Sequence, residues 1–201
     1  DEFSSDRLSL YWQWNHNPVA EGWSLTDRPG FMRLKTTRVV DNLYLAPNTM
    51  TQRMEGPECT ASVKLDIAKM KDGDVCGFSA FNGDAGVVKV VKEGKKAFVV
   101  ADSESVKLTD KEKKVTDVTI KEAFRQELKR GTKSVYFRID ANFRPGTDLA
   151  TLYYSADGNT WTPLIKDYKM IFDYRRFFMG SKFAIFNYAT KQTGGYVDVD
   201  W

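Results

Sequence analysis

The chain has 201 residues, of which 42% are hydrophobic and 13% aromatic, so it can bury a large core and does not belong to the disordered class. Its 30 basic and 27 acidic residues are interspersed along the chain and leave a net charge of +3, which argues against a nucleic-acid-binding protein. No apolar run approaches the roughly 20 residues of a membrane-spanning helix, and we expect neither a membrane partner nor a signal peptide.

Short alternating segments separated by turn residues fill the first half of the chain. Apolar and polar residues alternate in Phe31–Lys35 and in Thr60–Ile67, as expected for strands with one buried face. Pro29-Gly30 and Glu93–Lys96 are turn signals between such strands. The strands expected in this half are Leu10–Trp14, Gly22–Leu25, Phe31–Lys35, Leu43–Ala46, Thr49–Met54, Thr60–Ile67, Val75–Asn82, Ala85–Val91 and Ala97–Ala101.

The two cysteines are expected to be free and buried. We expect Ser62–Ile67 and Val75–Phe81 to form a hairpin about the turn at residues 71–73. In that register Cys59 and Cys76 lie too far apart for a disulfide bond. Two free cysteines say little about the cellular compartment.

The second half is also predicted to be β-structure. Residues 102–130 are the most charged part of the chain, and the alternation of Val115–Ile120 indicates solvated hairpins there, although Lys121–Lys129 fits one short helix as an alternative. Further strands are expected at Ser134–Phe143, Asp148–Ala156, around Trp161, and at Tyr168–Phe172, Lys182–Asn187 and Gly195–Trp201.

About fourteen short strands without a long helix predict an all-β protein, a two-sheet antiparallel β-sandwich of the jelly-roll type. No break in composition and no internal repeat divides the chain, so residues 1–201 are expected to form a single domain.

The residues that common catalytic sites require are missing from the sequence. His16 is the only histidine, and neither a Gly-x-Ser-x-Gly motif nor a Cys-x-x-Cys motif occurs. Glu55 and Glu58 lie in a turn that nothing marks as a glycosidase site. The sequence therefore favours a binding or accessory module over an enzyme.

The best candidate site begins at the run Tyr11–Pro18. Alternation places Trp12 and Trp14 on one face of an extended segment, so both indoles stack on a ligand or both lie in a core. Indole rings beside amide, imidazole and guanidinium donors suit a sugar, which has apolar faces and a hydroxyl rim. The alternative is that the indoles fill a core while neighbouring asparagines cap a turn. The candidate carbohydrate-binding residues are Trp12, Trp14, Asn15, His16, Asn17, Trp23, Arg28, Gln52 and Arg53.

Carboxylates near the two ends of the chain form a second candidate site. If the terminal segments meet, Asp1 and Asp200 could hold a structural Ca²⁺ ion. For Asp198, a solvated acidic edge that discourages association between sheets is the favoured interpretation.

Several runs resemble one known family. Trp12–Pro18, Trp23–Leu34 and Leu45–Arg53, together with Phe183–Thr190 and Gly194–Asp200 near the end, are similar to the C-terminal concanavalin A-like domain of family 43 glycoside hydrolases. That domain occurs in β-xylosidases and arabinofuranosidases and is also classed as carbohydrate-binding module family 91. The resemblance spans nearly the whole chain.

The resemblance implies an excised domain that, in parent enzymes, packs beside a catalytic five-bladed propeller. It implies a non-catalytic module for xylan, arabinoxylan or xylo-oligosaccharides in an extracellular or periplasmic protein. In that family a loop of the sandwich can reach the rim of the catalytic pocket. The alternative is therefore an accessory domain that docks on the propeller, shapes its substrate pocket and binds no sugar independently.

Overall fold

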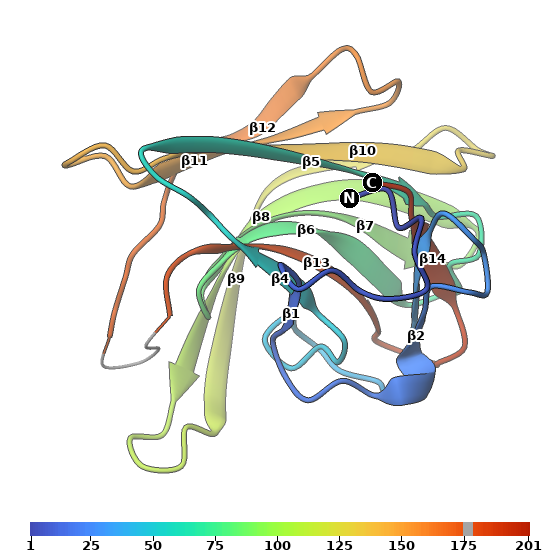
Figure 1. The fold of residues 1–201 in the computed structure, drawn as a ribbon, viewed down its shortest axis with the longest axis horizontal. Helices are drawn as coiled ribbons and strands as arrows, with labels where there is room; N and C mark the ends of the chain where they lie inside the picture. Colours follow the sequence, from blue (N-terminus) through green and yellow to red (C-terminus); the bar gives the residue numbers. More distant parts are fainter. Residues whose placement is uncertain (175–178) are drawn as a thin grey trace.

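Two seven-stranded antiparallel sheets pack face to face in the computed structural model, which describes residues 1–174 and 179–201 (Figure 1). Their fourteen strands confirm the predicted β-sandwich of concanavalin A type. The strands of sheet A, in spatial order, are β1 Gln13–Trp14, β4 Met50–Arg53, β13 Lys182–Ala189, β6 Asp74–Phe81, β7 Ala85–Glu93, β8 Lys96–Leu108 and β9 Val115–Glu127. Those of sheet B are β12 Thr162–Lys169, β11 Leu149–Ser155, β10 Ser134–Asn142, β5 Glu58–Asp66, β14 Tyr196–Val199, β3 Met32–Lys35 and β2 Trp23–Ser24.

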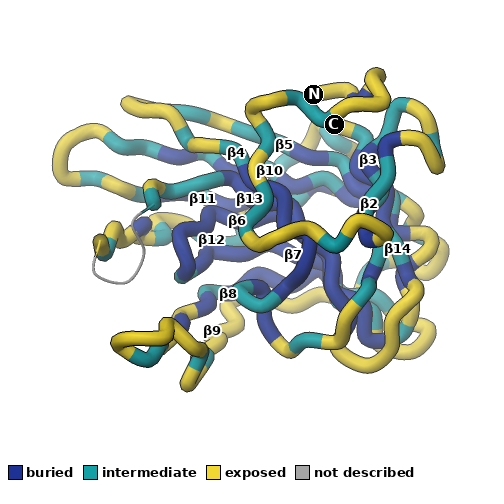
Figure 2. The backbone as a smooth tube through the Cα atoms, turned by 60° about the horizontal axis from the view of Figure 1, so that its bottom comes forward, coloured by how far each residue is buried: buried dark blue, intermediate teal, exposed yellow. Residues whose placement is uncertain are grey.

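One short 3₁₀ helix, η1 (Ala20–Gly22), precedes β2. Among the residues that the structure describes, no helix is long enough and apolar enough to cross a membrane. The two ends of the chain lie side by side in Figures 1 and 2.

The main core lies between the two sheets, and a second, smaller core lies on the outer face of sheet A. Alternate residues of β10, such as Val135, Phe137 and Ile139, fill the main core. On the outer face, Leu43 and Ala46 pack in a cluster with residues of β6, β7 and β13. We call residues 40–48 the cover segment. Because this segment covers the second face, all eight residues of β6 are buried, and Figure 2 shows the same for most of β7 and β13.

The expected hairpin of Ser62–Ile67 with Val75–Phe81 is wrong. β5 pairs with β10 and β14 in sheet B, whereas β6 pairs with β7 and β13 in sheet A. The connection between β5 and β6 therefore crosses from one sheet to the other. Both cysteines are free, as predicted, although Cys59 is only half-buried.

Other boundaries also differ from the sequence-based prediction. Leu43–Ala46 is not a strand, because it forms turns of the cover segment. The alternative of a helix at Lys121–Lys129 is wrong, since most of it belongs to β9. The two segments expected around Trp161 and at Tyr168–Phe172 are replaced by the single strand β12. The expected β7–β8 hairpin is confirmed, with Glu93 opposite Lys96.

A buried ion cluster lies under the cover segment. The Lys89 Nζ atom is 2.7 Å from Asp102 Oδ2 and 3.0 Å from Glu104 Oε1, and all three side chains are buried. The backbone N–H of Leu43 donates to Glu104 Oε2 at 3.3 Å. Burial raises the pKa of Asp102 to about 6, although the Lys89 ammonium opposes this shift. The cluster thus joins sheet A to the segment that covers it.

Candidate functional site

The predicted Trp-Gln-Trp run forms an edge strand of sheet A. β1 pairs with β4, with Gln13 opposite Thr51 and Trp14 opposite Met50. The Asn15 N–H donates to the Thr49 carbonyl at 2.9 Å and extends the pairing by one bond. Beyond this point the chain turns away toward Pro18, so the strand is shorter than the expected Leu10–Trp14.

The three predicted tryptophans pack against the main core. The Trp12 Nε1–H donates to Asp1 Oδ2 at 2.9 Å, and its ring stacks on Phe3 with 5.9 Å between centroids. The rings of Trp14 and Trp23 tilt against each other at 5.3 Å. All three indoles are half-buried. This arrangement favours the core interpretation for the pair Trp12 and Trp14.

Of the three polar residues that follow Trp14, His16 contacts another part of the chain through its side chain. The His16 Nε2 atom lies 2.6 Å from the carbonyl oxygen of Tyr44 in the cover segment, and the two rings meet edge to face at 5.8 Å. The Asn15 amide nitrogen is buried and has no hydrogen-bond partner among the described residues. Asn17 is exposed. The His16 loop is therefore fixed to the cover segment.

Asn48 is a structural residue of this region that the sequence analysis missed. Its Oδ1 atom accepts from the Val19 N–H at 2.7 Å, and its Nδ2–H donates to the Val19 carbonyl at 3.0 Å. The side chain thereby replaces a backbone partner for the segment that enters η1. An asparagine 29 residues away carries no local signal of such a bond.

Two predicted residues, Gln52 and Arg53, line a groove of about 370 Å³ beside β1. Leu10 and Tyr11 form one side of the groove, and their exposed fractions are 99% and 80%. We call this site the N-terminal groove, and its lining residues are Leu10, Tyr11, Gln13, Gln52, Arg53, Glu55, Cys59 and Phe183.

Arg53 lines the polar side of the N-terminal groove, and Lys182 contacts the lining residue Gln13. Lys182 Nζ donates to Gln13 Oε1 at 2.8 Å and orients that amide. Burial and the nearby Arg53 guanidinium lower the pKa of Lys182. The groove therefore combines an exposed apolar side with amide and guanidinium donors.

Arg28 lies apart from this groove, in an ion network on the outer face of sheet B. Its guanidinium donates to Asp66 at 2.8 Å and to Asp198 at 3.0 Å. Arg33 binds the Asp198 carboxylate through two bonds of 2.7 and 2.9 Å. Hydrogen bonds to Asp66 and Asp198 raise the pKa of Arg28. The interpretation of Asp198 as a solvated acidic edge is wrong, because its side chain is buried between two arginines.

The predicted calcium ligands each have donors from the protein. The Asp1 carboxylate accepts from the Phe3 N–H at 3.0 Å and from the Trp12 indole, whereas Asp200 pairs with Lys64. The hydrogen bond that Lys64 donates to Asp200 raises the pKa of Lys64. Across residues 1–174 and 179–201, no cluster of three or more His, Cys, Asp or Glu side chains could hold a metal ion. The calcium site stays a prediction that rests on Asp1 and Asp200 alone.

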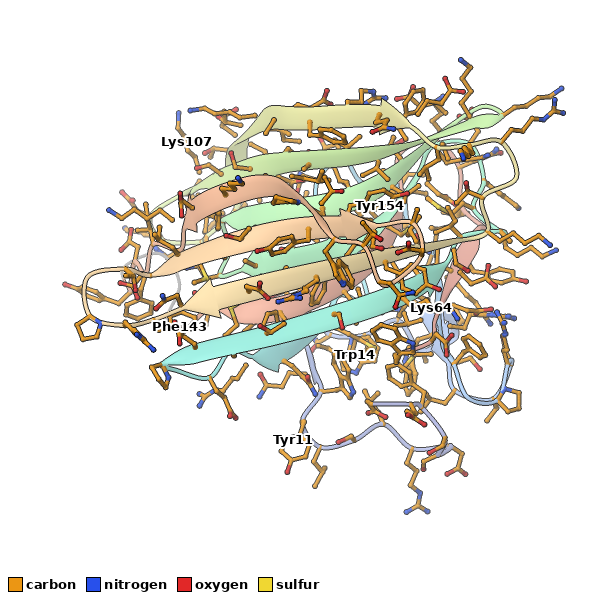
Figure 3. The ribbon with its side chains drawn as sticks, turned by 90° about the horizontal axis from the view of Figure 1, so that it is seen from above. Tyr11, Trp14, Lys64, Lys107, Phe143 and Tyr154 are labelled. Carbon is orange, nitrogen blue, oxygen red and sulfur yellow. The ribbon has the colours of Figure 1, made fainter. Side chains whose placement is uncertain are left out.

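A larger cavity, of about 520 Å³, was also missed by the sequence analysis. It lies between the end of β9, the following turn and the strands β10 and β11, and Lys129, Lys133, Tyr136 and Tyr154 are among its lining residues. We call it the turn cavity. Figure 3 shows Tyr154 among the strands, well separated from Tyr11 on the N-terminal loop.

Comparison with known proteins gives a match over the whole chain. A family model described as the β-xylosidase C-terminal concanavalin A-like domain matches residues 1–201. A β-xylosidase of Formosa agariphila is 29% identical over 224 aligned positions, which cover 100% of this chain and 34% of the relative. The chain thus spans about a third of the length of that relative.

Solved structures of related glycoside hydrolases contain the same fold. An engineered GH43 glycoside hydrolase, described as displaying endo-xylanase and exo-arabinofuranosidase activity, has a TM-score of 0.89 and 33% identity, and the match covers 100% of this chain and 39% of that chain. A bifunctional GH43-CE protein of Bacteroides eggerthii has a TM-score of 0.82 and 38% identity, and the match covers 100% of this chain and 24% of that chain.

Proposed function

Because the chain belongs to the family of C-terminal concanavalin A-like domains of β-xylosidases, we propose that it is a non-catalytic accessory domain that docks on a glycosidase catalytic domain. The relatives are about three times longer than this chain, which leaves room in them for a catalytic propeller. An extracellular or periplasmic location, which the resemblance implies, stays a prediction.

The exposure of Leu10 and Tyr11 supports docking through the N-terminal groove. Two adjacent large apolar side chains with exposed fractions of 99% and 80% are unusual on a solvated surface unless a partner covers them. They lie on the segment between Asp1 and β1, beside Gln52 and Arg53. An apolar centre with amide and guanidinium groups at its rim has the composition of a protein–protein interface.

The contacts of the tryptophans favour docking over independent binding of xylan. Stacking on a sugar requires a free indole face, and Trp12, Trp14 and Trp23 pack against Phe3, against each other and on the main core. A second candidate function, direct binding of xylo-oligosaccharides, depends instead on Tyr11 together with the Gln52 and Arg53 donors of the groove.

The test of docking uses the catalytic domain of the parent glycosidase as a separate polypeptide. We expect the two parts to form a complex in analytical ultracentrifugation, and we expect the double variant L10S/Y11S to weaken it at least tenfold. Ile120→Ser is the matched control, since Ile120 is also an exposed apolar residue but lies on β9. Absence of a wild-type complex, or equal weakening by the control, would contradict the proposal.

Titration calorimetry with xylohexaose separates the two candidates. Docking without sugar binding in the N-terminal groove predicts that Q52A/R53A leaves any heat of binding to the isolated chain unchanged. A measurable affinity that is lost in Q52A/R53A would instead support the xylan-binding candidate. The melting temperature of each variant shows whether a loss of binding comes from the change in the groove or from unfolding.

A further inference from the structure

We propose that the turn cavity binds an acidic oligosaccharide through a uronic acid carboxylate and its sugar ring. The site is formed by Gln126 of β9, Lys129, Thr132 and Lys133 of the following turn, and Tyr154 of β11. It shares no residue with the N-terminal groove, so it does not depend on the docking proposal.

The turn cavity has the size of a ligand site. Its volume of about 520 Å³ lies within the range of about 300–1,000 Å³ that is typical of small-molecule pockets. A second cavity of about 370 Å³ adjoins it at the same turn. The two cavities share Glu127, Leu128, Lys129 and Thr132, so a chain of several sugar units could extend from one into the other.

The charge around the two cavities is strongly positive. Six cationic side chains line them, whereas Glu127 is the one acidic lining residue, and it is paired with Lys96 at 2.9 Å. Neither Lys129 nor Lys133 forms an ion pair within the described part of the chain. The whole chain carries a net charge of only +3, so this concentration of cations is local. The cationic lining residues are Lys92, Lys95, Lys96, Lys129, Arg130 and Lys133.

The turn that carries these lysines is ordered by hydrogen bonds. The Thr132 N–H and hydroxyl both donate to the Lys129 carbonyl, at 3.1 and 2.7 Å. Gly131 has φ of +86°, which a residue with a side chain rarely adopts. The Lys133 carbonyl accepts from the Ile67 N–H at 2.8 Å. The backbone that bears Lys129 and Lys133 is therefore fixed before a ligand binds.

Tyr154 supplies a surface on which a sugar ring can stack. Tyr136 alternates with the core residues Val135 and Phe137, so its ring lies on the outer face of sheet B, 6.2 Å from that of Trp201, whereas Tyr154 lies opposite Phe137 on the core side. The Tyr154 ring is tilted against Phe137 at 6.2 Å, and burial raises its pKa, so the hydroxyl stays protonated and can donate. Stacking on such rings with a hydroxyl rim suits a carbohydrate.

An acidic sugar suits the size, the positive charge and the tyrosine of the site better than an inorganic anion or a neutral sugar does. An inorganic anion gains nothing from the Tyr154 face, and a neutral sugar gains nothing from the charge of the lysines. A carboxylate on a sugar ring uses both, with Gln126 and Thr132 available for ring hydroxyls. Xylan-type chains that carry glucuronic acid have this chemistry.

The experiment compares two probes of equal length by titration calorimetry on the full 201-residue chain. The probes are xylotetraose and xylotetraose that carries one glucuronic acid substituent. We expect the acidic probe to bind at least tenfold more tightly in low salt, and we expect this preference to fall below twofold in K129A/K133A. The double variant K107A/K114A is the matched control, because both lysines are exposed on the β8–β9 hairpin, far from the cavity. It should keep the full preference.

Three results would overturn the proposal. They are equal or absent binding of the two probes, equal losses in K129A/K133A and K107A/K114A, and tighter binding of a short single-stranded DNA or of polyglutamate, which would indicate a general polyanion surface. Tyr154→Leu keeps an apolar side chain toward Phe137 and removes the aromatic ring. We expect this variant to lower the affinity for the acidic probe at least threefold. Its melting temperature shows whether it remains folded. L10S/Y11S should leave the affinity for both probes unchanged, so failure of docking and failure of this site are distinguishable.

Discussion

The packing of Trp14 distinguishes a core residue from a residue that stacks on a sugar. Its indole packs on Trp23 and on the main core, so truncation removes packing and leaves a cavity. We expect Trp14→Ala to lower the free energy of unfolding by about 2–4 kcal/mol in urea denaturation. Tyr11→Ala, three residues earlier and exposed, should change it by less than about 0.5 kcal/mol. Equal effects would contradict the core assignment of Trp14.

Asp74 predicts a pH dependence of stability. Its side chain is buried, Oδ2 accepts from the Lys71 N–H at 2.7 Å, and Oδ1 has no partner among the described residues. Burial raises its pKa to about 6, above its usual value, so the folded state keeps the proton to higher pH than the unfolded state. Asp74 therefore contributes most to stability below about pH 4, and this contribution is lost as the pH rises to about 6.

The variant Asp74→Asn isolates this effect, because the other carboxyl groups titrate equally in both proteins. We expect the wild type to lose about 2 kcal/mol of unfolding free energy relative to Asp74→Asn between pH 4 and pH 7. Urea denaturation at the two pH values measures this difference. Parallel stability curves would show that Asp74 titrates normally.

At the scale of elements, the buried ion cluster attaches the cover segment to sheet A. Lys89 lies between two carboxylates, so Lys89→Met leaves Asp102 and Glu104 as uncompensated buried charges. We expect a loss of about 3–5 kcal/mol in unfolding free energy for this variant. The triple variant K89M/D102N/E104Q removes all three charges and keeps an acceptor for the Leu43 N–H, so it should recover at least half of that loss. A triple variant as unstable as Lys89→Met would show that the charges are not the cause.

The ranges of most strands could be predicted from the sequence, both for strands with one solvated face and for strands buried on both faces, but their pairing could not. β5 and β10 alternate in burial because water covers their outer face, and their predicted ranges lie close to those observed. The pairing of β5 and β6 could not be predicted, because no local pattern shows that the short connection between them crosses from one sheet to the other. Leu43–Ala46 resembles a strand in sequence because its apolar residues pack on sheet A without joining it.

The candidate site residues could also be predicted only where they are neighbours in the sequence. That Trp12 and Trp14 both pack on the main core agrees with their alternation, and Gln52 and Arg53 do lie together in a groove. The contact of His16 with Tyr44 joins residues 28 positions apart and carries no local signal. The turn cavity is formed where β9 meets β10 and β11 of the other sheet, so its lysines and Tyr154 come together only through the packing of the sheets.

At the scale of the whole molecule, the two proposed surfaces belong to different parts of one sandwich. The N-terminal groove lies beside β1, at one edge of sheet A, whereas the turn cavity lies where β9, at the opposite edge, meets sheet B. An accessory domain that docks through the first surface would leave the second one accessible to a polysaccharide. The molecule could then hold a charged chain while its partner cleaves it.

The position of the last two strands has a consequence for how the protein is synthesised. β13 lies between β4 and β6 in sheet A, and β14 lies between β3 and β5 in sheet B. Neither sheet can close until residues 182–199 have left the ribosome, and each closing pair joins segments more than a hundred residues apart. Such non-local pairing makes folding slow and leaves strand edges unpaired in the nascent chain. The sandwich therefore depends on residues 182–199 for completion, and a chain that stops before them would leave both sheets open.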